Sequence, residues 1–483
     1  MKNNSIKKNL VFNIMYQALV TLTPLITTPY VSRVLGADNI GEYSYVLSIA
    51  NYFCIFGLLG SSVYGQLLIS KSRDNDNDCR KAFSIVFYSR LLTMAISMAV
   101  YTFVIYTFKF DSQLYWVLFI YFIAQTIDIA WFFQGLERFD ITVPCNAIAK
   151  LLSIIGIFIL IKDKEDTALY VGLINGAIII GNALMWVSAR KYIKLSRIST
   201  NEIFYSIKAN FVFFIPTIAS VIFGSLDKCM IGWITLSNFQ NGYYEQASKI
   251  YNMLVAIITA LTVVMLPRMA YLWKDDNNRD LIKTYISKTM RYVGVIVLPI
   301  SIGLYVITPE FVPMFFGEGY EACVSIIRVF SAILVFTCFN SIISNQCLVA
   351  NGKQAILNKL LIVSSIINVL LNCVFIYNWQ ALGAALASLI SEFILLVLIV
   401  CKCKEFIQIK EWVKFMIKYA VFSLVMGIAV FSLKWIVPEN AITLILEIVV
   451  GGLIYALCLI LSKDIFMHEI LKKFRKRRDS LDK

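Results

Sequence analysis

The sequence predicts an all-α polytopic membrane protein of about fourteen transmembrane helices, arranged as two six-helix lobes and two C-terminal helices. Of its 483 residues, 59% are apolar and 15% are charged, whereas soluble domains have about 45–50% and about 25%. The mean hydropathy is +0.74, and the apolar residues could fill about fourteen spans of about 20 residues. This apolar content excludes single-span and peripheral proteins. Outer-membrane β-barrels are excluded because the apolar stretches run without alternating polar residues.

The first span is expected to be a transmembrane helix and not a cleaved signal peptide. Lys2, Lys7 and Lys8 precede an apolar run at 10–31, which is too long for a signal-peptide core and lacks a small-residue cleavage site. Hydrophobic windows predict further spans at 39–67, 82–107, 113–135, 141–161, 168–189, 210–234, 243–267, 291–316, 322–349, 355–378, 381–401, 413–436 and 441–462. No segment between these windows is long enough to fold as a separate domain.

The distribution of Lys and Arg predicts the orientation of the chain. With a cytoplasmic N-terminus, alternate loops place about 34 of the 44 Lys and Arg residues inside and about five outside. Both termini are therefore expected in the cytoplasm. The same rule accounts for the net charge of +14 without a nucleic-acid partner. The basic tail at 471–478 is expected to contact anionic lipids.

A short internal sequence repeat, called the echo below, predicts how the spans are grouped. The segment Ile40–Tyr45 opens the second span, and the similar segment Asn241–Gln246 opens the eighth, 201 residues later. Both follow an outside loop, as the duplicated halves of many transporters do. We therefore expect an N-lobe at 1–209, a C-lobe at 210–404, and helices thirteen and fourteen with the basic tail at 405–483.

Positive charges left at membrane depth point to a binding cavity. Each would cost about 2.5–3.5 kcal/mol at a helix centre, so it needs a partner or a wet cavity. A surplus of such charge suits an anionic passenger, although Arg33 and Arg328 could also reach the interface by snorkelling. The substrate-binding candidates are Arg33, Arg90, Lys150, Lys249 and Arg328.

Acids at the same depth have two possible roles. Asp128, Asp227 and Glu245 either pair with cations or bind and release a coupling ion, H+ or Na+. Glu245 could pair with Lys249 at i,i+4. Lys228 follows Asp227 directly, but successive helical residues point about 100° apart, so pairing between these two is not assumed.

Signatures of catalysis are missing. The sequence has no phosphate-binding loop, zincin motif or nucleophile elbow. Its single histidine is His468, and the Cys401–Cys403 pair has too few partners for a zinc site. We expect a transporter without a metal or cofactor, and not an enzyme.

Three sets of motifs carry a family resemblance. They are TPYVSRVLG at 28–36 with GEY at 41–43, DIAWFFQGLERF at 128–139, and LDKCMIG at 226–232 with GYY at 242–244. With these motifs the chain resembles the Wzx-type polysaccharide (O-unit) flippases of the MOP exporter superfamily, over essentially its whole length.

The resemblance implies a MATE-like fold and a passenger, an oligosaccharide repeat unit on undecaprenyl diphosphate. It would be moved by alternating access from the cytoplasmic to the outer leaflet of a bacterial plasma (inner) membrane, for O-antigen, capsule or exopolysaccharide synthesis. The resemblance also implies ion-coupled antiport, and partners such as the repeat-unit polymerase and the chain-length regulator.

Alternatives from the same superfamily are a lipid II flippase and a multidrug or ion antiporter. The antiporter would be expected to have a more acidic cavity. From another class, a polytopic glycosyltransferase or a polymerase would carry a large extramembrane loop, whereas the longest gaps between the predicted spans are about 20 residues.

Overall fold

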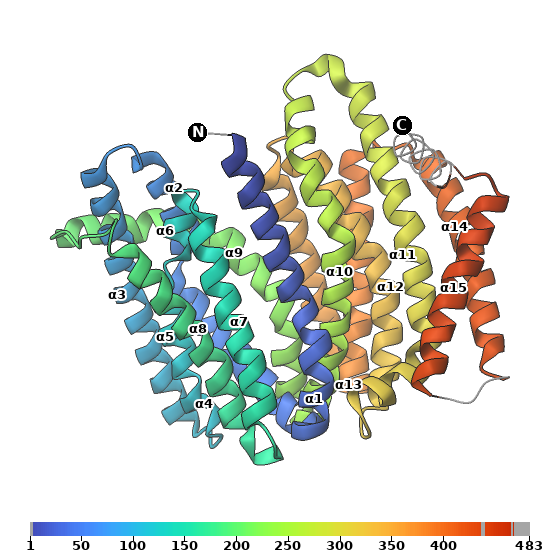
Figure 1. The fold of residues 1–483 in the computed structure, drawn as a ribbon, viewed down its shortest axis with the longest axis horizontal. Helices are drawn as coiled ribbons and strands as arrows, with labels where there is room; N and C mark the ends of the chain where they lie inside the picture. The colour runs from blue at the N-terminus through green and yellow to red at the C-terminus, as the bar shows by residue number, and fades with distance from the viewer. Residues whose placement is uncertain (1–2, 436–439, 465–466, 468–483) are drawn as a thin grey trace, which may run out of the picture. The chain divides into compact units, whose positions relative to one another are not determined.

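The computed structural model describes residues 3–435, 440–464 and 467, without the side chains of 3–14, 215–224, 261, 263–264 and 276. His468 and the basic tail at 471–478 lie outside the described residues. The chain forms two compact units, Met1–Glu245 and Gln246–Lys483, and within each unit long helices run side by side (Figure 1). Every regular element in the described residues is a helix.

Unit 1 contains ten elements. They are α1 (Asn3–Leu58), α2 (Ser61–Ser72), α3 (Asp76–Phe108), α4 (Leu114–Val117), α5 (Phe119–Thr126), α6 (Ala130–Gly135), α7 (Phe139–Leu160), the 3-10 helix η1 (Lys164–Asp166), α8 (Thr167–Ala189) and α9 (Thr200–Thr235). Helix α10 (Asn238–Leu272) begins in unit 1 and continues into unit 2. The other elements of unit 2 are η2 (Asp276–Asn278), α11 (Arg279–Phe316), α12 (Ala322–Ile343), the π-helix η3 (Ser344–Val349), α13 (Gln354–Cys403), α14 (Ile409–Leu433) and α15 (Ala441–Leu461).

The predicted polytopic all-α fold is confirmed. Ten helical stretches of the described chain are long and apolar enough to cross a membrane, or eleven if the bent α10 counts as one span. Two of the ten each hold two predicted spans, because α1 is interrupted at Gly36 (φ 77°) and α13 at Gln380 (φ 52°). Every predicted window falls on a helix, which is consistent with about fourteen spans.

Two predicted spans are not single continuous helices. The window 39–67 is interrupted at Leu59 and Gly60, which both have positive φ. The chain turns there because Gly60 lies against α9, where an added Cβ would come within 2.8 Å of the Phe213 carbonyl carbon. The window 113–135 is divided into α4, α5 and α6.

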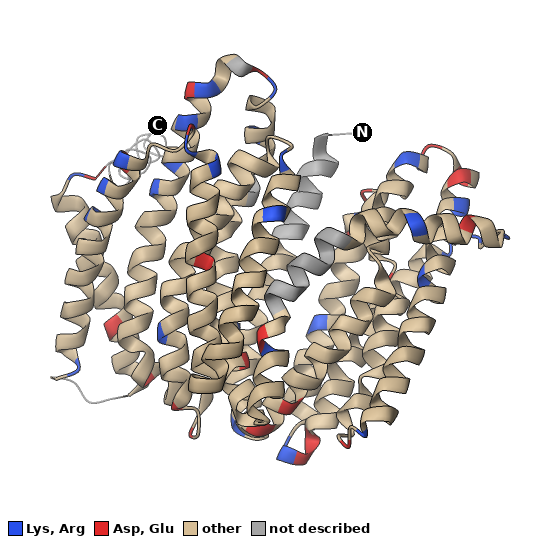
Figure 2. Ribbon diagram, turned by 180° about the vertical axis from the view of Figure 1, so that it is seen from behind, with Lys and Arg blue, Asp and Glu red and all other residues tan. Residues whose placement is uncertain are grey.

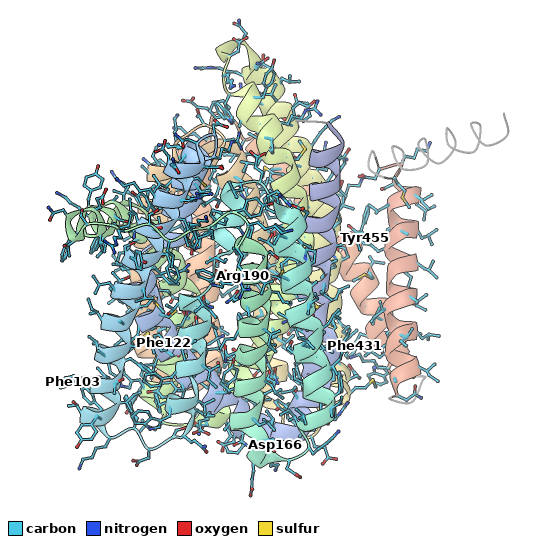
Figure 3. All side chains as sticks on the ribbon, turned by 60° about the vertical axis from the view of Figure 1, so that its left-hand side comes forward. Phe103, Phe122, Asp166, Arg190, Phe431 and Tyr455 are labelled. Atoms are coloured by element: carbon cyan, nitrogen blue, oxygen red, sulfur yellow. The ribbon has the colours of Figure 1, made fainter. Side chains whose placement is uncertain are left out.

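The helix surfaces are apolar, as a lipid environment requires. On α3, Phe103 is 68% exposed and points away from unit 1, whereas Phe122 of α5 is fully buried inside it (Figure 3). Figure 2 shows that charged residues gather at the helix ends and in the loops, with few along the helix bodies. Those few charged residues are therefore the candidates for a functional role.

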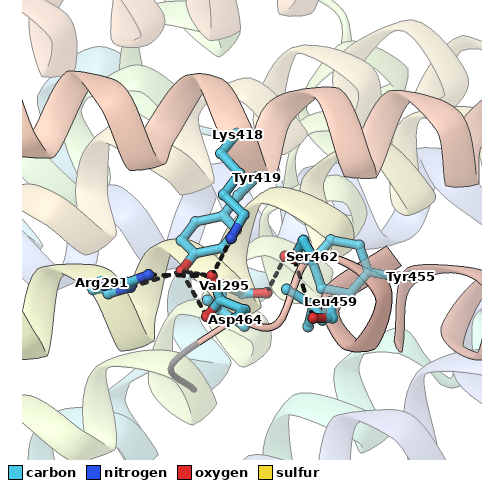
Figure 4. Close-up of polar contacts among 8 residues, drawn as sticks. All are labelled: Arg291, Val295, Lys418, Tyr419, Tyr455, Leu459, Ser462 and Asp464. Atoms are coloured by element: carbon cyan, nitrogen blue, oxygen red, sulfur yellow. Dashed lines mark hydrogen bonds and ion pairs between the residues drawn. The ribbon is translucent and has the colours of Figure 1, made fainter. Parts of the chain in front are cut away.

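A buried acid holds the end of α15 in unit 2 (Figure 4). The Asp464 side chain is fully buried, and its Oδ2 lies 2.6 Å from Lys418 Nζ and 3.1 Å from Arg291 Nη2. The Tyr419 hydroxyl also donates to Asp464, at 3.1 Å. These contacts join α11 and α14 to the segment after α15, so this charge cluster has a structural role.

The start of α9 gives a pH-dependent contact. Glu202 Oε1 lies 2.6 Å from Lys81 Nζ, and Oε2 accepts the Ser199 backbone N–H at 3.0 Å. Both contacts favour the carboxylate, so the pKa of Glu202 is lowered from its ordinary value of 4.5, by Lys81 first and then by Ser199.

Glu202→Gln is expected to lower the thermal midpoint at neutral pH. Because the folded-state pKa is the lower one, the stabilisation is present above the ordinary pKa of Glu and is lost as the pH falls through the folded-state value. The midpoints of wild type and variant should therefore converge in acid. Thermal unfolding in detergent across the pH range measures this, and a constant difference would contradict the assignment.

Candidate functional site

The two segments of the internal echo lie against each other in unit 1. Gly41 of α1 packs on the backbone of Asn238, so that a Cβ atom at position 41 would overlap the Asn238 carbonyl oxygen. Gly242 of α10 packs in the same way on the carbonyl of Ala37. Because glycine alone has no Cβ, only glycine permits this approach. The two segments therefore touch backbone to backbone.

Equivalent positions of the echo also meet through side chains. Ser44 donates a hydrogen bond to Glu245 Oε2 at 3.0 Å, and these two residues are 201 positions apart, the offset of the echo itself. Each segment thus presents the same face to the other, as in a two-fold interface between identical surfaces.

An ion pair joins the second echo segment, on α10, to α9. Lys228 Nζ lies 2.5 Å from Glu245 Oε2, and the two side chains are 21% and 15% exposed. Beside this pair, the Tyr244 hydroxyl donates to the buried Asp227 carboxylate. Asp227 and Lys228 thus take different partners, as expected for successive helical residues. We call this group the echo cluster: Gly41, Ser44, Lys228, Gly242 and Glu245.

Arg90 and Asp128 form a second polar group, at the break between α5 and α6. Arg90 is 1% exposed, and its guanidinium donates to the Asp128 carbonyl oxygen at 2.6 Å and to Ser62 Oγ at 3.2 Å. Asp128 Oδ1 accepts the backbone N–H of Ala130, the first residue of α6, at 2.8 Å. This enclosed geometry favours a structural role for both residues over contact with a passenger.

The other candidate cations lie in different parts of the two units. In unit 1, Arg33 is exposed on α1 and Lys150 is half-buried on α7. In unit 2, Lys249 is half-buried on α10. Arg328 of α12 donates to the Tyr305 carbonyl oxygen at 3.3 Å, with its guanidinium 4.9 Å from the Tyr305 ring centre. Binding of a passenger by these four residues stays a prediction.

The aromatic motif at 131–135 has a packing role. Trp131 is 1% exposed and stacks on Phe83 with 5.4 Å between ring centres. The ring of Trp131 lies against Gly65 of α2, at a distance that leaves no room for a Cβ. Glu137, which follows the motif with φ 58°, pairs with Arg73 at 2.8 Å. These contacts fix α2, α3 and α6 together.

Sequence reasoning missed Ser44 and Tyr244, and it did not treat Lys228 as a site residue. The offset of 201 residues was the signal that could have identified Ser44, because it pairs position 44 with position 245. The described residues contain no group of three His, Cys, Asp or Glu that could hold a metal ion.

Comparison with known proteins identifies the family. A model described as "Polysaccharide biosynthesis protein" matches residues 6–273, more than half of the chain. The chain belongs to this family of polysaccharide biosynthesis proteins. The resemblance to Wzx-type flippases indicated by the sequence motifs is confirmed.

The relatives of this polysaccharide biosynthesis protein have low sequence identity to it, but the similarity extends over most of the chain. A putative O-antigen transporter of Escherichia coli K12 is 21% identical over 80% of this chain and 94% of its own length. A probable low-salt glycan biosynthesis flippase of Haloferax volcanii is 24% identical over 69% of this chain and 70% of its own.

Solved structures share the fold. A lipid II flippase in an inward closed conformation has a TM-score of 0.75 and 16% identity, over 95% of this chain and 99% of its own. An inward-facing multidrug transporter of the MATE family has a TM-score of 0.64 and 13% identity, over 84% of this chain and 99% of its own. At these identities the likeness establishes the MATE-like fold alone.

Proposed function

We propose that this protein is a flippase, not an enzyme, that moves an undecaprenyl-diphosphate-linked oligosaccharide repeat unit across the plasma (inner) membrane of a bacterium. The observation that carries the proposal is the family match over residues 6–273. It is supported by the similarity to a putative O-antigen transporter over 80% of the chain. The product would feed synthesis of a surface polysaccharide such as O-antigen, capsule or exopolysaccharide.

The charge of the passenger matches the cations that the helices carry. A diphosphate entering the membrane needs positive partners at depth. Lys150 and Lys249 are half-buried, which would leave part of each side chain accessible to a passenger. Arg33 lies near the break of α1 at Gly36, and Arg328 lies near the start of α12. Arg90 is the weakest candidate because its guanidinium is already enclosed.

Lys150→Ala is expected to reduce export of the surface polysaccharide at least about tenfold, which corresponds to about 1.4 kcal/mol. Lys150→Arg should retain most export, because the charge is kept. Export per molecule of membrane-inserted protein is the measurement, with Lys109→Ala in a predicted outer loop as the control. Normal export by Lys150→Ala at native expression would remove Lys150 from the site.

The orientation proposed from the loop charges places both termini in the cytoplasm. A reporter fused after Lys483 is expected to behave as cytoplasmic, and one inserted within 162–166 as external. If both report the same side, the proposed orientation fails. A basic tail inside the cell could contact anionic lipids, and the repeat-unit polymerase and chain-length regulator would act on the product outside.

Coupling to H+ or Na+ is part of the proposal. Of the acids predicted for it, Asp227 and Glu245 are already bound to Tyr244 and Lys228, and Asp128 accepts the backbone N–H of Ala130. These contacts favour structural roles in this conformation. Flux in vesicles with imposed gradients tests each acid: an Asn or Gln variant of a coupling residue should keep downhill flux and lose its response to the gradient.

A lipid II flippase is the alternative with the most similar fold among the comparisons described. Rescue of cells depleted of their own lipid II flippase would favour it. A multidrug antiporter would protect cells against cationic compounds. A polysaccharide flippase should do neither.

A further inference from the structure

Unit 2 contains a buried acid that none of the roles above uses. Glu392 lies about midway between the break at Gln380 and the end of α13 at Cys403, ~17 Å from each at 1.5 Å per residue. Its side chain is 6% exposed. An unpaired charge at such a depth costs about 2.5–3.5 kcal/mol, so the surroundings of this carboxyl group decide which form it takes.

The partners of Glu392 are neutral. Asn340 Nδ2 donates to Glu392 Oε2 at 2.6 Å and to the Glu392 carbonyl oxygen at 3.0 Å. The Thr337 hydroxyl also hydrogen bonds the carboxyl group, and Thr337 lies 2.7 Å from the Tyr251 hydroxyl. The titratable groups that face Glu392 are Tyr251 from α10 and Cys338 from α12. No Lys or Arg in the described residues forms an ion pair with it.

One polar atom beside the Glu392 carboxyl group has no hydrogen-bond partner. A proton on that carboxyl group would supply one. Asn340 is 5% exposed, and its Oδ1 is buried without a hydrogen bond. A protonated carboxyl group has one O–H donor as well as an acceptor. It can therefore donate to the oxygen of an amide while accepting from the nitrogen of the same amide. The Asn340–Glu392 pair already has the N–H half of this arrangement, and the free Oδ1 suits the other half.

Polar side chains continue on both sides of Glu392. On α13, Ser388 lies one turn before Glu392 and accepts a hydrogen bond from Asn368 Nδ2 at 3.2 Å. On the other side, Gln346 lies ~9 Å along the chain from Asn340, in the π-helix η3, a geometry frequent at functional sites. Both side-chain polar atoms of Gln346 are buried without partners. Ser388 and Gln346 are thus polar groups within two turns of Glu392 and Asn340 along their helices.

We propose that Glu392 and Asn340 form a proton-binding site, occupied in this conformation, which exchanges its proton with water through the polar side chains on either side. On release the proton passes to water, and the carboxylate stays bound to the Asn340 amide and the Thr337 hydroxyl. The amide N–H group that faces the carboxyl oxygen disfavours a metal ion there. The use of the site in a transport cycle rests on the proposed function; the existence of the site does not.

Infrared difference spectroscopy of the purified full chain in lipid nanodiscs tests the site without any transport. At neutral pH the wild type is expected to show a carboxylic-acid C=O band that shifts in D2O and disappears in Glu392→Gln. The matched control is Glu310→Gln. Glu310 is also a largely buried acid of unit 2, but it pairs with Lys434 at 2.5 Å, so its removal should leave the acid band unchanged.

Asn340→Ala should keep the band and shift its frequency, because the acid loses its amide partner. Identical spectra for wild type and Glu392→Gln would overturn the proposal. Loss of the band on adding Na+ at constant pH would also overturn it, by showing a cation in place of the proton.

A vesicle assay then tests the use of the site. Wild-type flux is expected to respond to a proton gradient, and Glu392→Gln flux to lose that response while downhill flux and the folded amount persist. A gradient response in the variant equal to that of the wild type would overturn the coupling role. Absence of oligosaccharide flux in the wild type would instead count against the proposed passenger, with the infrared result unaffected.

Discussion

Replacing Gly41 with alanine is expected to destabilise the protein by about 3 kcal/mol or more. The added Cβ would overlap the carbonyl oxygen of Asn238, and a backbone atom cannot move aside as the end of a flexible side chain can. Gly242→Ala should behave alike, because its Cβ would overlap the Ala37 carbonyl oxygen. The measurement is the thermal midpoint and the yield of monodisperse protein in detergent.

Gly172→Ala and Gly176→Ala are the matched controls for these two variants. Both glycines lie in α8, and an added Cβ would meet nothing within 4 Å. Because glycine inside a helix is less stable than alanine, each control should be neutral or stabilising by about 0.5–1 kcal/mol. Equal effects in the echo cluster and in α8 would show that the two echo segments do not touch.

Glu245→Gln is expected to lower the free energy of unfolding by about 3 kcal/mol. The substitution leaves the half-buried Lys228 without the carboxylate that now lies 2.5 Å away. Lys228→Met should have a similar cost. The combined variant, Lys228→Met with Glu245→Gln, should regain much of the loss, since an uncharged pair is often tolerated where a single buried charge is not.

A double-mutant cycle on thermal stability measures this coupling. The exposed pair of Arg138 and Asp140, at 2.8 Å with both side chains 40% exposed, is the control and should show a coupling of about 1 kcal/mol or less. Additive losses at Lys228 and Glu245 would mean that the two residues act independently.

Hydrophobic windows were sufficient to predict the helices, because a lipid environment demands long apolar stretches whatever the tertiary packing. They also separated the two halves of α1 and of α13 near Gly36 and Gln380. The break at Leu59 and Gly60 could not be found in this way. It depends on the close approach of α9, which is a tertiary contact.

The candidate site was predicted less well, because residue types do not reveal backbone partners. In the sequence, Arg90 is a cation with no Asp or Glu three or four residues away. Its main acceptor is the backbone carbonyl oxygen of Asp128, which a helix break makes available and which has no signature in the sequence. By contrast, the 201-residue offset of the echo pairs position 44 with position 245, and Ser44 and Glu245 are hydrogen bonded in the structure.

The leaflet distribution of the lipid-linked repeat unit tests the central claim most directly. In cells that lack this chain, undecaprenyl-diphosphate-linked repeat units are expected to accumulate and to stay inaccessible to a membrane-impermeant sugar-modifying reagent added from outside. Expression of the wild type should restore access, and Lys150→Ala should not. Full external access in the absence of the chain, at normal repeat-unit levels, would contradict the flippase function.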